Sequence, residues 1–196
     1  MKIIVATKNP GKLREIKEFL GADFERLSFL DFEDSPNIEE TGATFLENAV
    51  LKAKTCFEWS GLPSVADDGG LEIDFLNGQP GVKSRRWPGY EATDEELIET
   101  ALNKLKGVPW EKRTASLVSV GVFYDGKNTI NAVEKIKGFI TENKATHFEK
   151  GYPFRAIFWV SEFKKLYQEL TREEHEAINH RRKVFLKLAN MVKAGI

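Results

Sequence analysis

The stretch VADDGGLEID, residues 65–74, holds the side chains with the clearest capacity for chemistry. Asp67 and Asp68 follow an apolar approach and precede Gly69 and Gly70, which would let the backbone approach a bound substrate closely. Aspartate and glycine both favour turns, so a plain turn would explain them. A pair of aspartates at the end of a buried strand can also hold a divalent cation. Because side chains alternate faces along an extended segment, we expect one carboxylate to do chemistry and the other to brace the loop.

A second candidate is the segment ATKNPGKLREI, in which a predicted strand leads through a polar loop into a predicted helix. Free N–H groups at a helix start and the helix dipole favour an anion, and Lys12 adds a mobile positive charge. Thr7 and Asn9 could hydrogen-bond phosphate or sugar oxygens. The spacing is not that of a Walker A loop. An ordinary capped helix with surface lysines explains the segment about equally well.

Two further pairs of charged residues could complete a site. Glu39 and Glu40 form an isolated acidic pair, which is usually a solvated turn but could supply a hard oxygen ligand to Mg²⁺. His180 and Arg181 could contact phosphate or base, or could belong to a basic helix face. Since Mg²⁺ is usually held by one or two carboxylates together with substrate phosphates, these stretches are together typical of a metal–nucleotide site.

The elements that must position these residues alternate between strands and helices. A short buried strand is expected at 3–6. A helix is expected to follow, with Asn9 as its N-cap, Pro10 at its first position and its end before Gly21. Capping-box spacing predicts further helices that open at Thr44, Thr93 and Thr171, the last being one continuous helix that buries Ile178, Phe185, Leu188 and Val192. Strands are expected at 114–124, 129–136 and 156–160, with a hairpin turn at Asp125-Gly126. This order predicts an α/β fold with a mixed sheet and helices packed on it.

Bulk properties limit the classes of function. With 196 residues, the chain is long enough for one domain, or for one domain split into two lobes. Its net charge of −1, with both signs interspersed, offers no basic face for nucleic acid. The apolar runs are too short to cross a bilayer, and the first residues lack the features of a signal peptide. A single cysteine, Cys56, excludes an intrachain disulfide. Taken together, these properties lead us to expect a cytoplasmic protein without nucleic-acid or membrane partners.

Five blocks carry a resemblance to a known family: ATKNPGKLREI, EETGATFLENAVLKAK, ADDGGLEIDFLNGQPGVKSRRWPG, RTASLVSV and ELTREEHEAINHRR. Their combination and order, from about residue 2 to 192, resemble the inosine triphosphate pyrophosphatase (Ham1/RdgB) family. The resemblance implies an elongated α/β fold, a single domain over residues 1–196 with two lobes around a central cleft, and a homodimer. It also implies Mg²⁺-dependent hydrolysis of inosine, deoxyinosine or xanthosine triphosphate to the monophosphate and pyrophosphate.

The resemblance also assigns roles by position. The family's phosphate-binding loop matches Thr7, Lys8, Asn9, Pro10, Gly11 and Lys12. Its metal-binding glutamate matches Glu39, and its general base and metal contact matches Asp68. His180 and Arg181 match residues that contact the nucleotide. Within the implied mechanism Lys12 holds the phosphates in line, and Asp67 could raise the basicity of Asp68.

Several positions depart from the family pattern. The serine after the aspartate pair is Gly69, and a lysine near the start of the last helix is His175. In the block that contacts the base, the family's aspartate is Arg155, which has donors and no acceptor. Tyr152 or Phe154 could still stack on a purine. We therefore expect the pyrophosphate-releasing chemistry to be kept and base selectivity to be shifted or loosened.

Two other hypotheses stay open at this stage. The chain could perform the same chemistry on a different or broader set of nucleotides. It could also be a catalytically silent nucleotide-binding module, although Lys12, Glu39 and Asp68 together argue against this, because a binder has little use for a metal-activated water.

Overall fold

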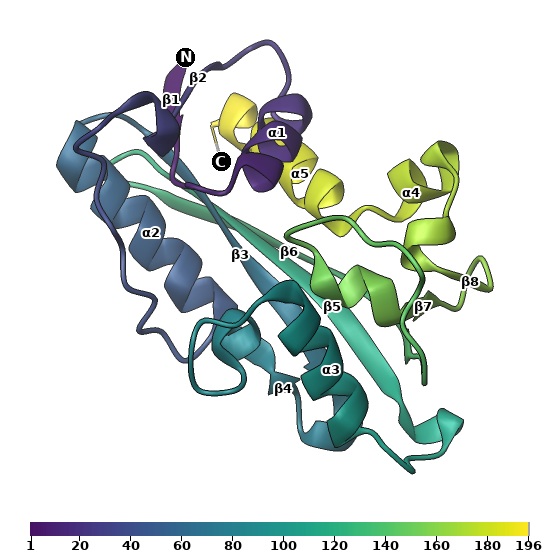
Figure 1. Cartoon of the computed structure of the whole chain (residues 1–196). Coiled ribbons are helices and arrows are strands. Elements are labelled where there is room, and N and C mark those ends of the chain that lie inside the picture. Colours follow the sequence, from purple (N-terminus) through teal and green to yellow (C-terminus); the bar gives the residue numbers. More distant parts are fainter. Residues whose placement is uncertain (196) are drawn as a thin grey trace. The chain divides into compact units, whose positions relative to one another are not determined.

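The computed structural model describes residues 1–195 and contains one mixed β-sheet with helices packed against it (Figure 1). The strands are β1 (Lys2–Val5), β2 (Glu25–Ser28), β3 (Ser64–Ile73), β4 (Gln79–Pro80), β5 (Thr114–Tyr124), β6 (Thr129–Ile140), β7 (Phe158–Val160) and β8 (Lys165–Leu166). Their order is β2-β1-β3-β5-β6-β7-β8, and β4 pairs with β3. β1 runs parallel to β2 and β3, whereas the β3–β4, β6–β7 and β7–β8 pairs are antiparallel. The mixed α/β class is therefore confirmed.

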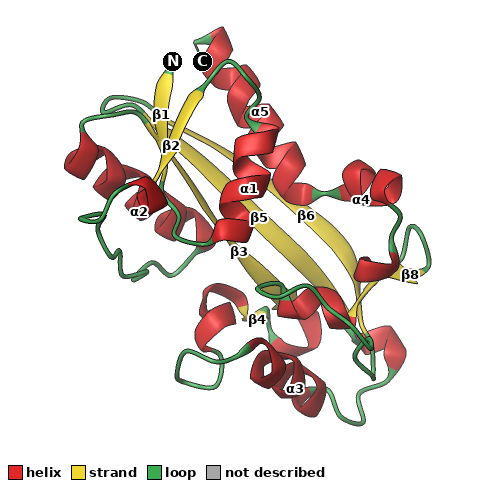
Figure 2. Ribbon diagram, turned by 45° about the horizontal axis from the view of Figure 1, so that its top comes forward, coloured by secondary structure: helices red, strands yellow, loops and turns green. Residues whose placement is uncertain are grey.

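Five α-helices accompany the sheet in the described part of the chain (Figure 2). They are α1 (Pro10–Phe19), α2 (Phe45–Ser60), α3 (Asp94–Lys104), α4 (Arg172–Ile178) and α5 (His180–Ala194). Short 3-10 helices are η1 (Phe29–Asp31), η2 (Asp74–Leu76), η3 (Gly81–Arg86), η4 (Trp110–Lys112), η5 (Pro153–Ile157) and η6 (Tyr167–Glu169). Within residues 1–195, no helix combines the length and apolar character that crossing a membrane requires.

The chain divides into two compact units. Unit 1 comprises residues 1–69, 119–134 and 180 onwards, and unit 2 comprises residues 70–118 and 135–179. The boundaries fall inside β3, β5 and β6, so each of these strands contributes residues to both units. The Asp67–Asp68 pair and the Thr7–Lys12 loop belong to unit 1, whereas the Tyr152–Arg155 block and His175 belong to unit 2.

Unit 1 owes its packing to the alternation of strand side chains and to two neighbouring helices. Asn9 caps α1, and Gly21, whose φ is 78°, follows the end of the helix as the sequence predicts. α1 and α5 lie side by side (Figure 1), and their apolar faces bury a cluster with Ile3, Val5, Ile16, Phe19, Val184, Phe185 and Leu188. α2 is tied to β3, since the Ser64 hydroxyl donates to the carbonyl of Ala53 at 2.6 Å.

Unit 2 is built around the apolar face of α3 and the segment η5. Thr93 and Glu96 form the predicted capping box at the start of α3. The core cluster includes Leu71, Leu97, Ile98, Phe154, Ile157 and Phe158. The buried guanidinium of Arg113 donates to the carbonyls of Leu105, Ile140 and Thr141, so one side chain joins the end of α3 to the end of β6. The sequence alone did not single out this residue.

The final helix differs from the prediction. One continuous helix from Thr171 was expected, but α4 ends at Ile178 and α5 begins at His180. Asn179 has φ −54° and ψ 104°, which takes the backbone out of the helix while its N–H still donates to the carbonyl of His175. The strand expected at 156–160 is also shorter, because η5 occupies residues up to Ile157. β6 extends four residues beyond the predicted end.

Gly121 in β5 provides a test of the packing of α5. A Cβ at this position would lie 2.5 Å from Cγ1 of Val184 and 2.7 Å from Cδ1 of Leu188, both on α5. We expect Gly121→Ala to lower the free energy of unfolding by roughly 1–3 kcal/mol in urea titrations, because overpacking a dense core forces neighbours to move. Val133→Ala, at a strand position with 44% exposure, should change the stability by less than about 0.5 kcal/mol. Equal stabilities of the two variants would contradict this packing.

Candidate functional site

Asp67 is buried among cationic side chains in unit 1. Its Oδ2 lies 2.8 Å from Nζ of Lys12, and its Oδ1 accepts from the Ser119 hydroxyl at 3.1 Å and from Nε of Arg181 at 3.3 Å. Arg181 Nη1 donates in turn to Glu15 at 2.6 Å. Two cations and two carboxylates thus form a cluster with no net formal charge, which is a condition for burying ions without a large penalty.

The pKa of Asp67 follows from this environment. Burial alone raises the pKa of a carboxyl group, but the positive charges of Arg181 and Lys12 more than offset that effect and hold the pKa of Asp67 well below its ordinary value. Asp67 therefore stays ionised at neutral pH and is a poor proton acceptor. It fulfils the bracing role expected of one member of the pair, because it holds α1 and α5 to β3.

Asp68 has different partners. Its Oδ1 lies 3.3 Å from Nζ of Lys52, and the same ammonium lies 2.7 Å from Oε1 of Glu40. Its Oδ2 is buried and accepts no hydrogen bond from any residue between 1 and 195. Burial raises the pKa of Asp68 above its ordinary value, and the positive charge of Lys52 offsets only part of that effect. Asp68 is thus the member of the pair that is suited to accept a proton or bind a cation.

Lys52, on α2, connects Asp68 of β3 with Glu40 of the loop that precedes α2. Burial lowers the pKa of a lysine, but Asp68 and Glu40 raise the pKa of Lys52 beyond that effect, so the ammonium stays charged. Asn48, also on α2, accepts from the backbone N–H of Gly42 at 2.7 Å and so fixes the loop that carries Glu40. This part of the site is preorganised by a helix and by a strand, which are rigid elements.

The residues around Asp68 fit a hard cation. The buried Oδ2 without a hydrogen-bond partner is an oxygen donor that such an ion would satisfy, and Glu40 is a second carboxylate held close by Lys52. No group of three His, Cys, Asp or Glu side chains that could hold a metal occurs within residues 1–195. A site with one or two protein carboxylates suits Mg²⁺ when substrate phosphates supply the remaining ligands.

The two glutamates of the acidic pair are placed differently. Glu40 is half-buried and bonded to Lys52, whereas Glu39 is exposed. The assignment of the metal ligand to Glu39 stays a prediction, and the geometry favours its neighbour Glu40.

The Thr7–Lys12 loop departs from one expectation. Free N–H groups were expected at the start of α1, but Asn9 Oδ1 accepts from the N–H groups of Gly11 and Lys12 at 2.9 and 3.1 Å. Thr7 Oγ1 accepts from the N–H of Asn9 at 3.2 Å. The loop therefore satisfies these groups internally, because Asn9 caps the helix. Its capacity to bind an anion depends more on the ammonium of Lys12, whose side chain is 23% exposed.

His180 and Arg181 are both buried at the start of α5. The break at Asn179 places them in the first turn of α5 rather than midway along a longer helix. The guanidinium of Arg181 donates to Asp67 and to Glu15 and so holds both carboxylates in place. The role of both residues in nucleotide contact stays a prediction.

Three residues that contact the aspartates or Arg181 in unit 1 were not predicted from the sequence: Lys52, Glu15 and Ser119. Lys52 had a detectable signal, because it falls on the apolar stripe of α2 between Ala49 and Ala53, where an ion is unexpected unless it has partners. Glu15 precedes Ile16 on the buried face of α1 in the same way. Ser119 gave no such signal, since small polar residues are common in strands.

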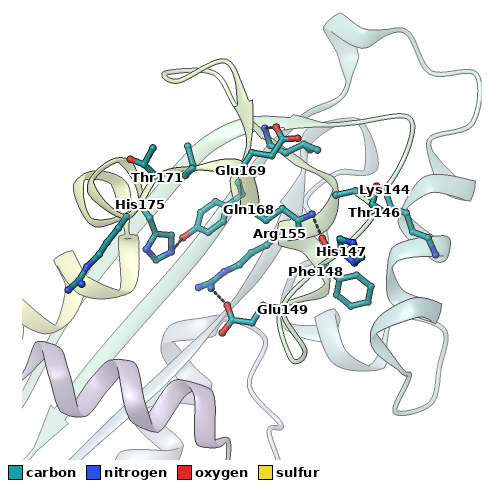
Figure 3. A pocket seen from close by; sticks show the side chains of 15 residues that line it. Lys144, Thr146, His147, Phe148, Glu149, Arg155, Gln168, Glu169, Thr171 and His175 are labelled. Atoms are coloured by element: carbon teal, nitrogen blue, oxygen red, sulfur yellow. Dashed lines mark hydrogen bonds and ion pairs between the residues drawn. The ribbon is translucent and has the colours of Figure 1, made fainter.

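Unit 2 contains a pocket of about 830 Å³. It is lined by residues 144–149 and 166–172 together with Arg155 and His175 (Figure 3). The buried Arg155 donates from Nη1 to Oε2 of Glu149 at 3.0 Å. The pocket therefore contains two of the positions at which the chain departs from the pattern of the resembling family.

The aromatic residues expected to stack on a base are placed differently from each other. Phe154 is buried in the core of unit 2 and packs edge-on against Trp87, with ring centroids 6.4 Å apart. This makes Phe154 a core residue rather than an open platform for a base. The guanidinium carbon of Arg155 lies over the ring of Tyr152, 3.7 Å from the ring centroid, in a cation–π contact.

The glycines after the aspartate pair also have a structural explanation. A Cβ on Gly70 would lie 2.2 Å from the Ser84 hydroxyl, which accepts from the N–H of Leu71. The space above Gly70 is thus filled by Ser84 and not by a ligand, contrary to the expectation of close ligand approach there. The assignment of Gly69 to substrate binding stays a prediction.

Solved structures with the same fold give the class of the protein. A Ham1 protein of Coxiella burnetii superposes with a TM-score of 0.86 at 32% identity over 99% of both chains. The Ham1 protein of Staphylococcus aureus superposes with a TM-score of 0.87 at 31% identity over the full length of both chains. The fold is therefore that of Ham1 proteins, with an open mixed sheet flanked by helices.

Sequence comparison gives the family. The Ham1 family profile matches residues 3–191. A protein of Geobacillus kaustophilus named dITP/XTP pyrophosphatase is 41% identical over 95% of this chain and 92% of its own. A Bacillus subtilis protein with the same name is 38% identical over 97% and 96% of the two chains. The chain belongs to the Ham1 family.

The ionic cluster at Asp67 leads to a prediction on stability. Asp67→Asn removes the negative charge that pairs with the buried ends of Lys12 and Arg181. We therefore expect the free energy of unfolding at pH 7 to fall by about 3–5 kcal/mol. The folded-state pKa of Asp67 lies below the unfolded value of about 3.9, so its contribution is present above about pH 4 and is lost as the pH falls through the folded-state pKa. The difference between wild type and variant should therefore shrink on acidification.

Denaturant unfolding at pH 7 and below pH 4 measures this difference. Glu25→Gln is the matched control, because Glu25 forms an exposed ion pair with Lys2 at 3.3 Å and should contribute less than about 1 kcal/mol. A loss at Asp67 as small as that at Glu25, or one that grows in acid, would contradict the role given to the cluster.

Proposed function

We propose that this chain is a nucleoside triphosphate pyrophosphatase that hydrolyses non-standard purine nucleotides such as dITP and XTP to the monophosphate and pyrophosphate. The similarity to proteins named dITP/XTP pyrophosphatase supports this class of substrate. The observation that carries the chemistry is the contrast between adjacent carboxylates. Asp67 is fully occupied by cations, whereas Asp68 has a raised pKa and a buried oxygen without a hydrogen-bond partner.

The proposal includes a magnesium ion held by Asp68 and by a glutamate of the preceding loop. Glu40 is the favoured glutamate because it shares the ammonium of Lys52 with Asp68. When bound, such an ion neutralises phosphate charge and acidifies water. Lys52 then serves as the neighbouring positive charge that keeps both carboxylates ionised and oriented.

Asp68 acts as the general base. It orients a water molecule and takes its proton while the water oxygen forms a bond to phosphorus at the α–β bridge. The P–O bond of the anhydride breaks, and pyrophosphate leaves. An ordinary carboxylate is a weak base at neutral pH, so the elevation of the Asp68 pKa by burial moves it towards the range that proton transfer requires.

Lys12 provides positive charge for the phosphates. Its ammonium is held 2.8 Å from Asp67, which in turn is fixed by Arg181 and Ser119. A charge whose position is set in advance stabilises charge that develops during reaction better than a mobile one. Arg181 and Asp67 are positioning residues on this account, and Lys12 is the residue that touches the substrate.

A substrate panel with an Asp68→Asn variant tests the proposal. Asparagine keeps the shape of Asp68 but cannot accept the proton, so we expect turnover of ITP and XTP to fall by at least ~100-fold, at the low end of the range for general base catalysis. Nucleotide binding should persist. Pyrophosphate release gives the rate, and calorimetry with the monophosphate product gives the binding.

The matched control is Asp31→Asn, which removes an aspartate of η1 that is exposed and bonded to Ser28. It should leave turnover unchanged. A wild-type protein that binds these nucleotides but releases no pyrophosphate would establish a silent binding module, and an Asp68→Asn variant with wild-type turnover would remove Asp68 from the mechanism.

A further inference from the structure

The loop before α2 is attached to the start of that helix at consecutive residues. The N–H of Gly42 donates to Oδ1 of Asn48 at 2.7 Å, and the N–H of the next residue donates to Oε2 of Glu47 at 2.6 Å. Thr44, the N-cap, accepts from the N–H of Glu47 at 3.1 Å. In Figure 1 the segment before α2 runs beside the helix until it reaches the first turn. Glu40, two residues before Gly42, therefore belongs to a loop with a fixed path.

Asn48 is the buried member of these attachment points. It is 1% exposed, whereas Glu47 lies on the surface. Asn48 comes four residues before Lys52, so the two side chains share one face of α2. Nζ of Lys52 lies 2.7 Å from Oε1 of Glu40 and 3.3 Å from Oδ1 of Asp68. One face of α2 thus holds Glu40 through Lys52, and holds the backbone two residues later through Asn48.

Gly42 is the residue type that this attachment requires. A Cβ at Gly42 would lie 2.7 Å from Oδ1 of Asn48 and 2.7 Å from Cβ of Glu47. Both distances are shorter than van der Waals contact, so any larger residue would push the loop away from α2. The contact between Gly42 and Asn48 is therefore specific, because it joins a bare backbone to a buried amide.

The amide of Asn48 is oriented by this contact, since Oδ1 has to face the N–H of Gly42. Nδ2 is then a buried donor, and it has no hydrogen-bond partner among residues 1–195. Oδ2 of Asp68 is a buried acceptor in the same condition. Unsatisfied buried groups lower the stability of a fold, so packing alone does not explain them. A hydrated divalent cation supplies both kinds of partner, namely positive charge for a carboxylate oxygen and water oxygens for an amide donor.

We propose that Asn48 is a positioning residue of a divalent-cation site made by Asp68 and Glu40, and that it sets the affinity of this site for the ion. The inference rests on the metal site of the proposed function and names the residue that controls it. By holding the N–H of Gly42, Asn48 keeps the carboxylate of Glu40 next to Lys52 before the ion arrives. A ligand that is already in place loses little conformational freedom on binding.

The first test measures binding of Mn²⁺, which prefers the same oxygen ligands as Mg²⁺. Electron paramagnetic resonance counts free Mn²⁺ as the ion is titrated into the whole protein without nucleotide. The binding that Asp68→Asn abolishes defines the site. Asn48→Leu keeps the approximate volume of the side chain and removes the amide, so we expect it to weaken this binding by roughly tenfold, as is typical for residues that orient a metal ligand. Wild-type affinity in this variant, or no such binding by the wild type, would overturn the inference.

Gly42→Ala reaches the same contact from the loop. Its Cβ displaces the N–H from Asn48, so we expect a similar loss of Mn²⁺ affinity while the buried side chains of α2 stay unchanged. The double variant should bind Mn²⁺ no more weakly than the weaker of the two single variants, because both changes break one contact. Losses that add would show two independent effects and would contradict this contact as their cause.

Gly121→Ala is the matched control. It adds the same methyl group to another crowded glycine of unit 1, where the nearest atom is Cγ1 of Val184 at 2.5 Å. It should lower the free energy of unfolding without changing the Mn²⁺ affinity. An equal loss of affinity in Gly121→Ala and Gly42→Ala would assign the effect to general destabilisation and overturn the inference.

The Mg²⁺ dependence of pyrophosphate release separates positioning from chemistry. In Asn48→Leu we expect the Mg²⁺ concentration for half-maximal rate to rise by roughly tenfold, while kcat at saturating Mg²⁺ stays within about twofold of the wild-type value. Asp68→Asn should lose turnover at every Mg²⁺ concentration. A lower kcat in Asn48→Leu with an unchanged half-maximal concentration would place Asn48 in the chemical step and overturn its positioning role.

Mn²⁺ binding needs no turnover, so this inference and the proposed function fail separately. If the wild type releases no pyrophosphate from ITP or XTP, but Asn48→Leu still loses Mn²⁺ affinity, the proposed function fails and the inference holds. If pyrophosphate is released and Asn48→Leu binds Mn²⁺ as tightly as the wild type, the inference fails and the proposed function holds.

Discussion

Side chains of adjacent residues on an extended strand point to opposite faces, and this constraint gives Asp67 and Asp68 different partners within unit 1. One carboxylate faces Lys12, Arg181 and Ser119, and the other faces Lys52. Two neighbouring residues of one strand therefore differ in role: the Asp67 carboxylate is held by ion pairs, and the Asp68 carboxylate keeps an oxygen without a hydrogen-bond partner. The pKa values of the two carboxyl groups shift in opposite directions as a result, with Asp67 lowered and Asp68 raised.

Each of the two aspartates is held by a different set of elements. Three elements, α1, β3 and α5, meet at the cluster around Asp67, so the position of Lys12 is set by buried charges that balance in number. α2 and the loop before it bring Lys52 and Glu40 to Asp68. In unit 2, by contrast, the charged group on the pocket wall is held by aromatic rings around Arg155. Ion pairing thus organises the residues proposed for phosphate chemistry in unit 1, and cation–π packing organises the wall of the pocket in unit 2.

The fold class, the Asp67–Asp68 pair and the capped helices could be predicted from the sequence, because hydrophobic periodicity and caps are local signals. The break at Asn179 could not, since the pattern of buried residues continues across it from Ile178 to Phe185. The roles of Lys52 and Glu15 could not be predicted either, because their partners are distant in sequence and become neighbours only through tertiary packing. The N-cap predicted at Asn9 is confirmed, because an asparagine directly before a proline is a local signal for a helix start, and this cap occupies the N–H groups of Gly11 and Lys12. Dimerisation stays a prediction.

A crystal structure with Mg²⁺ and a non-hydrolysable xanthosine or inosine triphosphate analogue tests the central claim most directly. The account predicts an ion bonded to Oδ2 of Asp68, with Glu40 as the nearer of the two glutamates, while Asp67 keeps its bonds to Lys12 and Arg181. An ion bound to Asp67, or an Asp68 carboxylate that remains without any contact to ion, water or phosphate, would contradict it.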